Sequence, residues 1–517
     1  MIDSNPDSRQ TLASQYENLT TDRQPYLDRA YDVAALTLPQ LIVRDGDLNQ
    51  DLLTPYQSVG ARGLTAMTSK VLMALFPPSH PFMRFQTDPF SLRELGENVR
   101  SEVKQSLAEI EQTVVSALEA EALRPHLNEA IKQLIGTGNC LFHLPEAGGA
   151  KVHKMDRYVV RRDPAGNILK IVIKECVSPA KLPEEVRVAM NTAQPNLRTD
   201  GSVDIYTGIL LSEDGDSYEV YQEVGGHMIA ETQGSYKLGE LPWLALRMEA
   251  VTGTSYGYGY VAGHLGDLKS LETLMESLVT AAAASAKVVF LVEGTTDIQS
   301  LADAASGDVL PGSEKDVSTV QVNKAADMRV AYETVNSIKS DLQSAFLLNQ
   351  SIQRKGERVT AAEIRFLAEE LSSVLSGAYS LLSVEFQLPL VKLVLGRLTK
   401  EGKVPDIPSD VATPTIVTGL EGLAQGAELQ RLDSFVGGVV STFGPDVAAR
   451  HIDVSDYLTR RATATGIIPD GLVRTAEEVA AEVQQQQAMQ AMSQLASPGM
   501  GLAGKLAEVT QQNNNQQ

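Results

Sequence analysis

One long amphipathic pattern limits the possible folds of this chain more than any other feature of its sequence. Thr360-Ala361-Ala362-Glu363 has the form of a capping box, in which two side chains satisfy free backbone N–H groups at a helix start. The pattern after it predicts a helix that runs towards Leu398 and approaches about 60 Å, at ~1.5 Å per residue. Pro389 removes a hydrogen bond to Glu385, so we expect a kink there. The apolar stripe consists of Ile364, Leu367, Leu371, Val374, Ala378, Leu381 and Phe386.

The residues before this helix change their periodicity twice. Helical spacing dominates the start of the chain, as between Asn98 and Ala122. From about 139 to 243, β-branched residues alternate with polar ones. Within that stretch, Tyr158 to Ile173 and Val203 to Val224 each carry a central turn signal, which predicts two antiparallel hairpins.

Helical spacing then returns from Tyr260 and again from about Ala325 to Leu348, with a short β unit between the two predicted helices. After Pro405, Pro408 and Pro414 we expect shorter helices up to about Gln484, followed by a Gln-rich tail with little periodicity. The order of elements indicates an α+β protein that is mainly α.

The composition supports a helix-rich core and argues against sequence-specific nucleic-acid binding. Aromatic residues make up only 5% of the 517 residues, so Leu, Val, Ile and Ala must form the core. The formal net charge is −21, whereas a sequence-specific DNA binder normally presents a basic surface. An acidic wall is still compatible with a protein that surrounds DNA and lets it slide.

No motif in the sequence predicts catalysis, a metal site or a cofactor. Cys140 and Cys176 lack CxxC spacing, and the seven histidines are scattered without an HExxH pair. Gly499 to Lys505 has the spacing of a phosphate loop, but Leu506 stands where a magnesium-binding hydroxyl is required. No apolar run has the length of a membrane span, and the N-terminus does not resemble a signal peptide, so we expect a soluble, non-enzymatic protein.

One basic cluster is the candidate site for nucleic acid. Arg354, Lys355 and Arg358 lie just before the capping box, around Gly356. In a monomer the cluster is explained by a solvated loop. In a ring with this loop facing inwards, it would form a cationic girdle that touches phosphates without reading bases.

Several long stretches of the chain match a known family. The chain resembles the portal, or head-to-tail connector, proteins of short-tailed, autographivirus-type double-stranded DNA bacteriophages from about residue 10 to about residue 480. The stretches that carry this resemblance are Tyr56-Gln57-Ser58-Val59-Gly60-Ala61-Arg62-Gly63-Leu64, Ala74-Leu75-Phe76-Pro77, Ser255-Tyr256-Gly257 with Leu265-Gly266-Asp267-Leu268, and Gln353-Arg354-Lys355-Gly356-Glu357-Arg358-Val359-Thr360-Ala361.

The resemblance implies a portal fold with wing, stem, clip and crown regions. The wing would comprise residues 1–255, including the β-rich insertion at about 139–243. The other regions would be a first stem helix at 256–287, a clip at 288–324, a second stem helix at 325–348, a tunnel loop at 349–359, a long spine helix at 360–404, a crown at 405–484 and a flexible Gln-rich tail at 485–517.

The resemblance also implies a structural role in the virion. The chain would form a homo-oligomeric ring, expected to be a dodecamer, at one capsid vertex, and would conduct double-stranded DNA during packaging and ejection. The implied partners are the major capsid protein, the scaffolding protein, the terminase large subunit, the tail adaptor protein, the internal core proteins and double-stranded DNA bound without sequence specificity. Assembly would take place in the host cytoplasm, without a membrane. The open alternatives are a scaffold or adaptor that does not conduct DNA, and an enzyme of the packaging machinery.

Overall fold

The chain divides into two compact units, Met1–Gly419 and Leu420–Gln517. In neither unit does the described part of the chain contain a helix long and apolar enough to cross a membrane. The computed structural model describes residues 10–47, 50–77, 82–87, 97–120, 122–146, 149–184, 187, 201–285, 289–292, 299, 303, 317–320, 325–348, 370–371, 373–375, 377–405, 407, 412–416, 432–452 and 454–464.

Four helices form the start of the first unit, as the helical spacing predicts. The first begins where the Thr11 side chain accepts a hydrogen bond from the backbone N–H of Ser14, and the last ends at Gly138, whose φ of +86° closes the final turn. Their buried faces meet in one core that also includes the neighbouring strands. The helices are α1 (Leu12–Leu36), α2 (Val59–Leu75), α3 (Glu97–Ala120) and α4 (Arg124–Thr137).

The β-rich stretch folds into two antiparallel sheets. In the larger sheet the strands follow one another in sequence order, and both predicted hairpins are confirmed by the pairs Tyr158–Ile173 and Ile205–Val224. The larger sheet comprises β4 (Tyr158–Arg162), β5 (Ile168–Val177), β6 (Val203–Leu211), β7 (Ser217–Val224) and β8 (His227–Lys237). The smaller sheet has the order β3 (Lys151–His153), β2 (Asn139–His143) and β9 (Trp243–Arg247).

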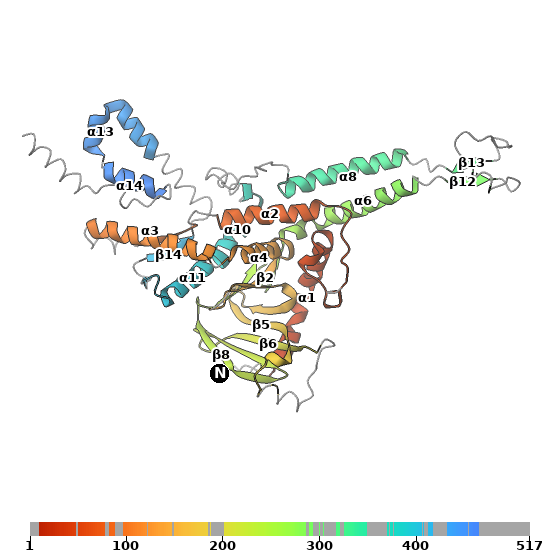
Figure 1. Cartoon of the computed structure of the whole chain (residues 1–517), viewed down its shortest axis with the longest axis horizontal. Coiled ribbons are helices and arrows are strands. Elements are labelled where there is room, and N and C mark those ends of the chain that lie inside the picture. The colour runs from red at the N-terminus through yellow and green to blue at the C-terminus, as the bar shows by residue number, and fades with distance from the viewer. Residues whose placement is uncertain are drawn as a thin grey trace, which may run out of the picture. The chain divides into compact units, whose positions relative to one another are not determined.

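Two long helices, α6 (Leu265–Ser285) and α8 (Ala325–Ala345), lie side by side (Figure 1). The strands β12 (Val289–Val292) and β13 (Val317–Val320) pair antiparallel between them in sequence, as predicted. The first helical turns, predicted from Tyr260, instead form the 3₁₀ helix η6 (Tyr260–His264). A side chain at Gly259 would collide with the backbone of Gly136, so the residue just before η6 packs directly against the end of α4.

The long predicted helix is described only from Glu370 onwards, and the capping box at Thr360 lies outside the described residues. Its later part consists of α10 (Gly377–Leu382), the π-helical segment η7 (Ser383–Gln387) and α11 (Leu388–Lys400). The disturbance expected from Pro389 takes the form of this π-helix: the N–H of Leu388 donates to the carbonyl of Ser383, five residues earlier. The buried ring of Phe386 then lies edge-on to Phe76 and Phe142, with ring centroids 5.5 and 5.3 Å apart.

One strand in the proline-rich stretch after Pro405 has no counterpart among the elements expected from the sequence. β14 (Ala412–Ile416) pairs antiparallel with β1 (Met83–Thr87), so that Pro414 lies opposite Phe85. A proline cannot donate to the ladder, and it is tolerated because a two-stranded sheet leaves one side of each strand free.

The second unit is helical where it is described. Its described part comprises residues 432–443, α13 (Pro445–His451) and α14 (Val454–Ala464). The hydroxyl of Tyr457 donates to Asp433 Oδ1 at 2.6 Å, which ties α14 to the first of these helices.

Candidate nucleic-acid interface

The three basic residues of the candidate site lie outside the described residues. Arg354, Lys355 and Arg358 belong to the expected tunnel loop at 349–359, called here the loop segment, and the structure describes the chain up to Leu348 and again from Glu370. One flank is the end of α8, up to Leu348. The other begins at Glu370.

The first flank is fixed by a buried phenylalanine. Phe346 is fully buried and lies against α2 at Gly63, where an added Cβ would be 2.5 Å from the ring. Its ring also contacts Tyr260 and His264, with centroids 6.2 and 5.5 Å away. The Tyr260 hydroxyl donates to the carbonyl of Ala345 at 2.9 Å. The end of α8 therefore sits in a notch that only a glycine on α2 can leave open.

Both flanks meet at one lysine of α2. The ammonium of Lys70 donates to the carbonyl oxygen of Leu347 at 2.9 Å, and it lies 3.5 Å from Glu370 Oε2. The side chains of Lys70 and Glu370 are only 20% and 9% exposed. Leu347 itself has a φ of +54°, which ends the helical path of α8.

A second ion pair supports the helical segment that follows. Arg247, at the end of β9, places Nη2 2.6 Å from Glu385 Oε1 in the π-helix. Arg162 lies near this pair and donates to the carbonyls of Gly166 and Ala245. Burial, and then the charge of Arg247, lower the pKa of Arg162. These groups line one wall of a cavity of about 700 Å³ between the sheets and the π-helix.

The base of α6 is tied to the N-terminal helices. The carboxylate of Glu272 accepts hydrogen bonds from the backbone N–H groups of Tyr56 and Gln57, at 2.8 and 3.1 Å. Lys269 forms an ion pair with Asp32 of α1 at 2.8 Å. The α6–α8 pair is thus anchored at the end that lies opposite β12 and β13.

The pair of helices carries an excess of negative charge. Together α6 and α8 contain six acidic and three basic residues in their sequences. The two helices bury a narrow stripe that includes Leu268, Leu271, Val335 and Leu342. Most of their remaining described positions are exposed, and these include the apolar side chains of Val279, Val330 and Tyr332.

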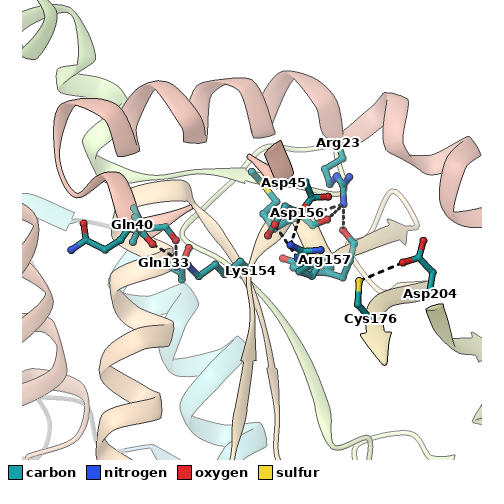
Figure 2. Close-up of polar contacts among 12 residues, drawn as sticks. Arg23, Gln40, Asp45, Gln133, Lys154, Asp156, Arg157, Cys176 and Asp204 are labelled. Atoms are coloured by element: carbon teal, nitrogen blue, oxygen red, sulfur yellow. Dashed lines mark hydrogen bonds and ion pairs between the residues drawn. The ribbon is translucent and has the colours of Figure 1, made fainter. Parts of the chain in front are cut away.

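A buried arginine organises the contact between α1 and the start of β4 (Figure 2). Arg23 Nη1 donates to the hydroxyl of Tyr16 and to the carbonyls of Met155, Asp156 and Tyr158, at 2.9 to 3.1 Å. Its acceptors are neutral, so this side chain acts as a structural cross-link. Burial raises the pKa of the Asp156 carboxyl, although the charge of Arg157 opposes this.

The histidines of the β2–β3 hairpin approach each other, as their spacing allows. The rings of His143 and His153 are stacked with centroids 6.4 Å apart, and His143 also stacks on Trp243 at 4.3 Å. Burial lowers the pKa of His143 to about 3, so the ring is neutral at neutral pH. Among the described residues, no cluster of His, Cys, Asp and Glu has the geometry of a metal site.

The sequence does not predict the ion pairs Lys70–Glu370 and Arg247–Glu385. Each of these residues sits within a helix or strand whose apolar pattern is explained by the core. Their partners are separated by 300 residues and by 138 residues in the sequence, so no local spacing reveals them. A lysine beside the buried stripe of a helix is the only local signal, and it is common on ordinary surfaces.

Comparison with known proteins gives a consistent picture. Residues 9–473 match the model of the family described as bacteriophage head to tail connecting protein. The chain is 37% identical to the portal protein of Escherichia phage T7 over 483 residues, which cover 92% of this chain and 90% of that protein. It is 36% identical to the portal protein of Enterobacteria phage T3, over 95% of this chain and 93% of that protein. The chain is also similar to a solved structure titled "Neck of empty GTA particle computed with C6 symmetry". The match covers 80% of this chain and 90% of that chain, at 12% sequence identity and a TM-score of 0.34, which is too low to support a conclusion.

Proposed function

Because the chain belongs to the bacteriophage head to tail connecting protein family, we propose that it is a portal subunit that forms a ring at one capsid vertex and conducts double-stranded DNA. The ring would serve as the attachment site for the packaging motor and the tail. In this proposal α6 and α8 are the stem helices, β12 and β13 belong to the clip, and the loop segment faces the channel.

The observation that carries this proposal is the form of the α6–α8 pair. Two long helices lie side by side, are anchored at one end by Glu272 and Lys269, and leave most of their surface open. Exposed apolar side chains such as Val330 and Tyr332 need neighbours to cover them, and a closed ring supplies those neighbours without leaving an open edge.

The charge of the helices supports the role of a conduit. An acid excess on α6 and α8 repels phosphates, so DNA would pass without being gripped. The proposed contacts with DNA are Arg354, Lys355 and Arg358 in the loop segment, which would touch phosphates without base specificity. The proposed partners are further copies of this chain, the capsid and scaffolding proteins, the terminase large subunit, the tail adaptor and the internal core proteins, in a particle assembled in the host cytoplasm.

Imaging of the purified full-length chain by electron microscopy tests the proposal. We expect closed rings with an open central channel, and twelve-fold classes if the ring is a dodecamer. Elongated monomers or filaments would contradict a portal ring and would favour a scaffold or adaptor that does not conduct DNA.

A further inference from the structure

We infer that the cavity between the two sheets and the π-helix is a binding site for a small molecule that carries a carboxylate on an apolar body. The cavity has a volume of about 700 Å³, and every residue that lines it belongs to the described part of the first unit. Volumes of about 300 to 1,000 Å³ are typical of sites for small ligands. The inference goes beyond the conduction of DNA and does not depend on it.

Two arginines converge at one point of the cavity wall, beside Gly166. Arg162 Nη1 donates to the carbonyl of Gly166 at 2.8 Å, and a Cβ added at Gly166 would lie 3.4 Å from Arg247 Nη2. Burial, and then the charge of Arg247, lower the pKa of Arg162, as expected where a second cation lies close by. The wall therefore concentrates positive charge at this point.

The two guanidinium groups have more donors than acceptors around them. Each has five N–H donors and no acceptor of its own. Among the described residues, their side chains donate to the carbonyls of Gly166 and Ala245 and to the carboxylate of Glu385. The Nε atoms of both arginines are buried without an acceptor. A carboxylate fits such a wall, because it can accept two parallel N–H bonds from one guanidinium.

The charges at the wall are not balanced by its carboxylates. The carboxylate of Glu385 pairs with Arg247 at 2.6 Å. Asp163 also lines the cavity, but its carboxylate accepts hydrogen bonds from the N–H and Nδ2 of Asn167, within its own turn. In the described part of the chain, Arg162 thus has no carboxylate partner. A partly buried cation without a counter-ion favours an anionic ligand over a neutral one of the same shape.

The remaining walls of the cavity are mostly apolar. Leu241, Trp243 and Leu244 line it and are buried, and Trp243 is held in place by its stacking on His143, with ring centroids 4.3 Å apart. Leu238 also lines the cavity, and 52% of it is exposed. An inorganic anion would leave this apolar surface in contact with water, whereas an apolar body attached to the carboxylate would cover it.

The first experiment compares two probes of the same shape on the full-length protein. Fluorine-19 NMR titration gives the dissociation constants of 4-fluorophenylacetate and of its neutral isostere, 4-fluorophenylacetamide. We expect the acid to bind at least about tenfold more tightly than the amide, because only the acid supplies a counter-ion for Arg162. Equal affinities, or no binding of the acid, would overturn the inference.

Three variants locate the binding of the acid. Arg162→Met should weaken it at least about tenfold and leave the amide within about twofold. Glu385→Gln keeps an acceptor for Arg247 but removes the competing carboxylate, so it should tighten binding of the acid at least about threefold. Arg161→Met is the matched control, because Arg161 is the preceding residue of β4, is exposed and lies outside the cavity, so neither probe should change.

The two charge changes act in opposite directions, which damage to the fold does not imitate. An Arg162→Met variant that binds both probes equally less well would overturn the recognition of the carboxylate. If Arg162→Met does not fold, Glu385→Gln decides, and unchanged or weaker binding of the acid by that variant would contradict the site.

A further probe separates a small molecule from a segment of a protein. The peptide acetyl-Phe-Glu-amide places a carboxylate beside an apolar side chain, and its displacement of 4-fluorophenylacetate gives its affinity. We expect the peptide to bind no more tightly than the small acid. Binding at least about tenfold tighter would assign the cavity to an acidic protein segment and would overturn a small-molecule site.

Discussion

Arg247 and Glu385 form an ion pair, with Nη2 2.6 Å from Oε1, that joins the last residue of β9 to the middle of a π-helix. Arg247 is more deeply buried than Glu385, with 9% of its side chain exposed against 21%. The π-helical turn places Glu385 against Arg247 and the next residue, Phe386, in the core, where its ring is fully buried. Since π-helices are rare, this one is explained by the need to satisfy both contacts just ahead of Pro389.

Removal of one partner of this pair should be costly. Arg247→Met leaves Glu385 without its counter-ion, and we expect a loss of about 2–4 kcal/mol in the free energy of unfolding. The double variant Arg247→Met with Glu385→Met should lose less than the single one, because no charge is then left unpaired. Denaturant unfolding of the three proteins checks this order.

The matched control is an exposed ion pair. Lys269→Met breaks the contact with Asp32, whose side chain is half exposed, and should cost less than about 1 kcal/mol. If Lys269→Met and Arg247→Met cost the same, the Arg247–Glu385 pair contributes no more than a surface contact.

The notch at Gly63 gives a second prediction. Gly63→Ala places a Cβ 2.5 Å from the ring of Phe346, so Phe346 must move, and we expect a loss of about 1–3 kcal/mol. Gly396→Ala on α11 meets nothing within 4 Å and should be neutral or stabilise by up to about 1 kcal/mol. Thermal unfolding of the two variants side by side tests this, and equal melting temperatures would contradict the notch.

The buried carboxyl of Glu111 predicts a dependence on pH. Burial raises the pKa of Glu111, although its carboxylate accepts a hydrogen bond from the N–H of Phe85 at 2.8 Å. The folded state therefore favours the protonated acid, and the chain loses stability at this site as the pH rises from the ordinary glutamate pKa through the raised pKa, with the loss complete above it. Glu111→Gln keeps an acceptor and cannot ionise, so we expect it to unfold at the same or a higher temperature than the unmodified chain at pH 8.

The sign of this effect can be checked by lowering the pH. As the pH falls through the raised pKa, Glu111 becomes protonated in the unmodified chain, and the advantage of Glu111→Gln should disappear. Melting temperatures at pH 8 and near the ordinary pKa of a glutamate provide the measurement. An advantage that grows towards low pH would show that the charged form of Glu111 stabilises the fold.

The basic cluster gives the functional prediction. Changing Arg354, Lys355 and Arg358 to alanine should leave ring formation intact and reduce the DNA retained per particle roughly severalfold, because phosphate contacts supply non-specific affinity. Particle images check assembly, and nuclease-protected DNA per particle checks retention.

The control for this variant removes the same charge elsewhere. Alanine at the exposed positions Lys151, Lys392 and Lys400 changes the net charge equally and should leave retention unchanged. Equal retention by the two triple variants would mean that the loop segment makes no special contact with DNA.

Local patterns in the sequence were sufficient for the elements whose partners lie nearby. The helix predicted between Asn98 and Ala122 forms as α3, with Val114 and Leu118 buried, and the hairpins around Gly166 and Gly215 form because each turn contains its own signal. In both cases the residues that determine the structure lie within a few turns of one another.

The features that the patterns missed all depend on distant partners. β14 contains Pro414 and lacks clear alternation, and it becomes a strand only because β1 is available to pair with it. Lys70 looks like an ordinary helical lysine until the fold brings Leu347 and Glu370 to it. The basic residues of the loop segment, by contrast, are visible in the sequence, and their role stays a prediction.

The pairing of β1 with β14 has a consequence for how the chain is made. Gln86 and Thr415 lie on adjacent strands of this sheet but are 329 residues apart in the sequence. At a translation rate of about 5–20 residues per second, β1 leaves the ribosome roughly 15 to 65 seconds before its partner exists. Throughout that interval the backbone groups of Met83 to Thr87 have no strand to bind. A chaperone that shields this segment during synthesis would therefore raise the yield of subunits in which β1 and β14 are correctly paired.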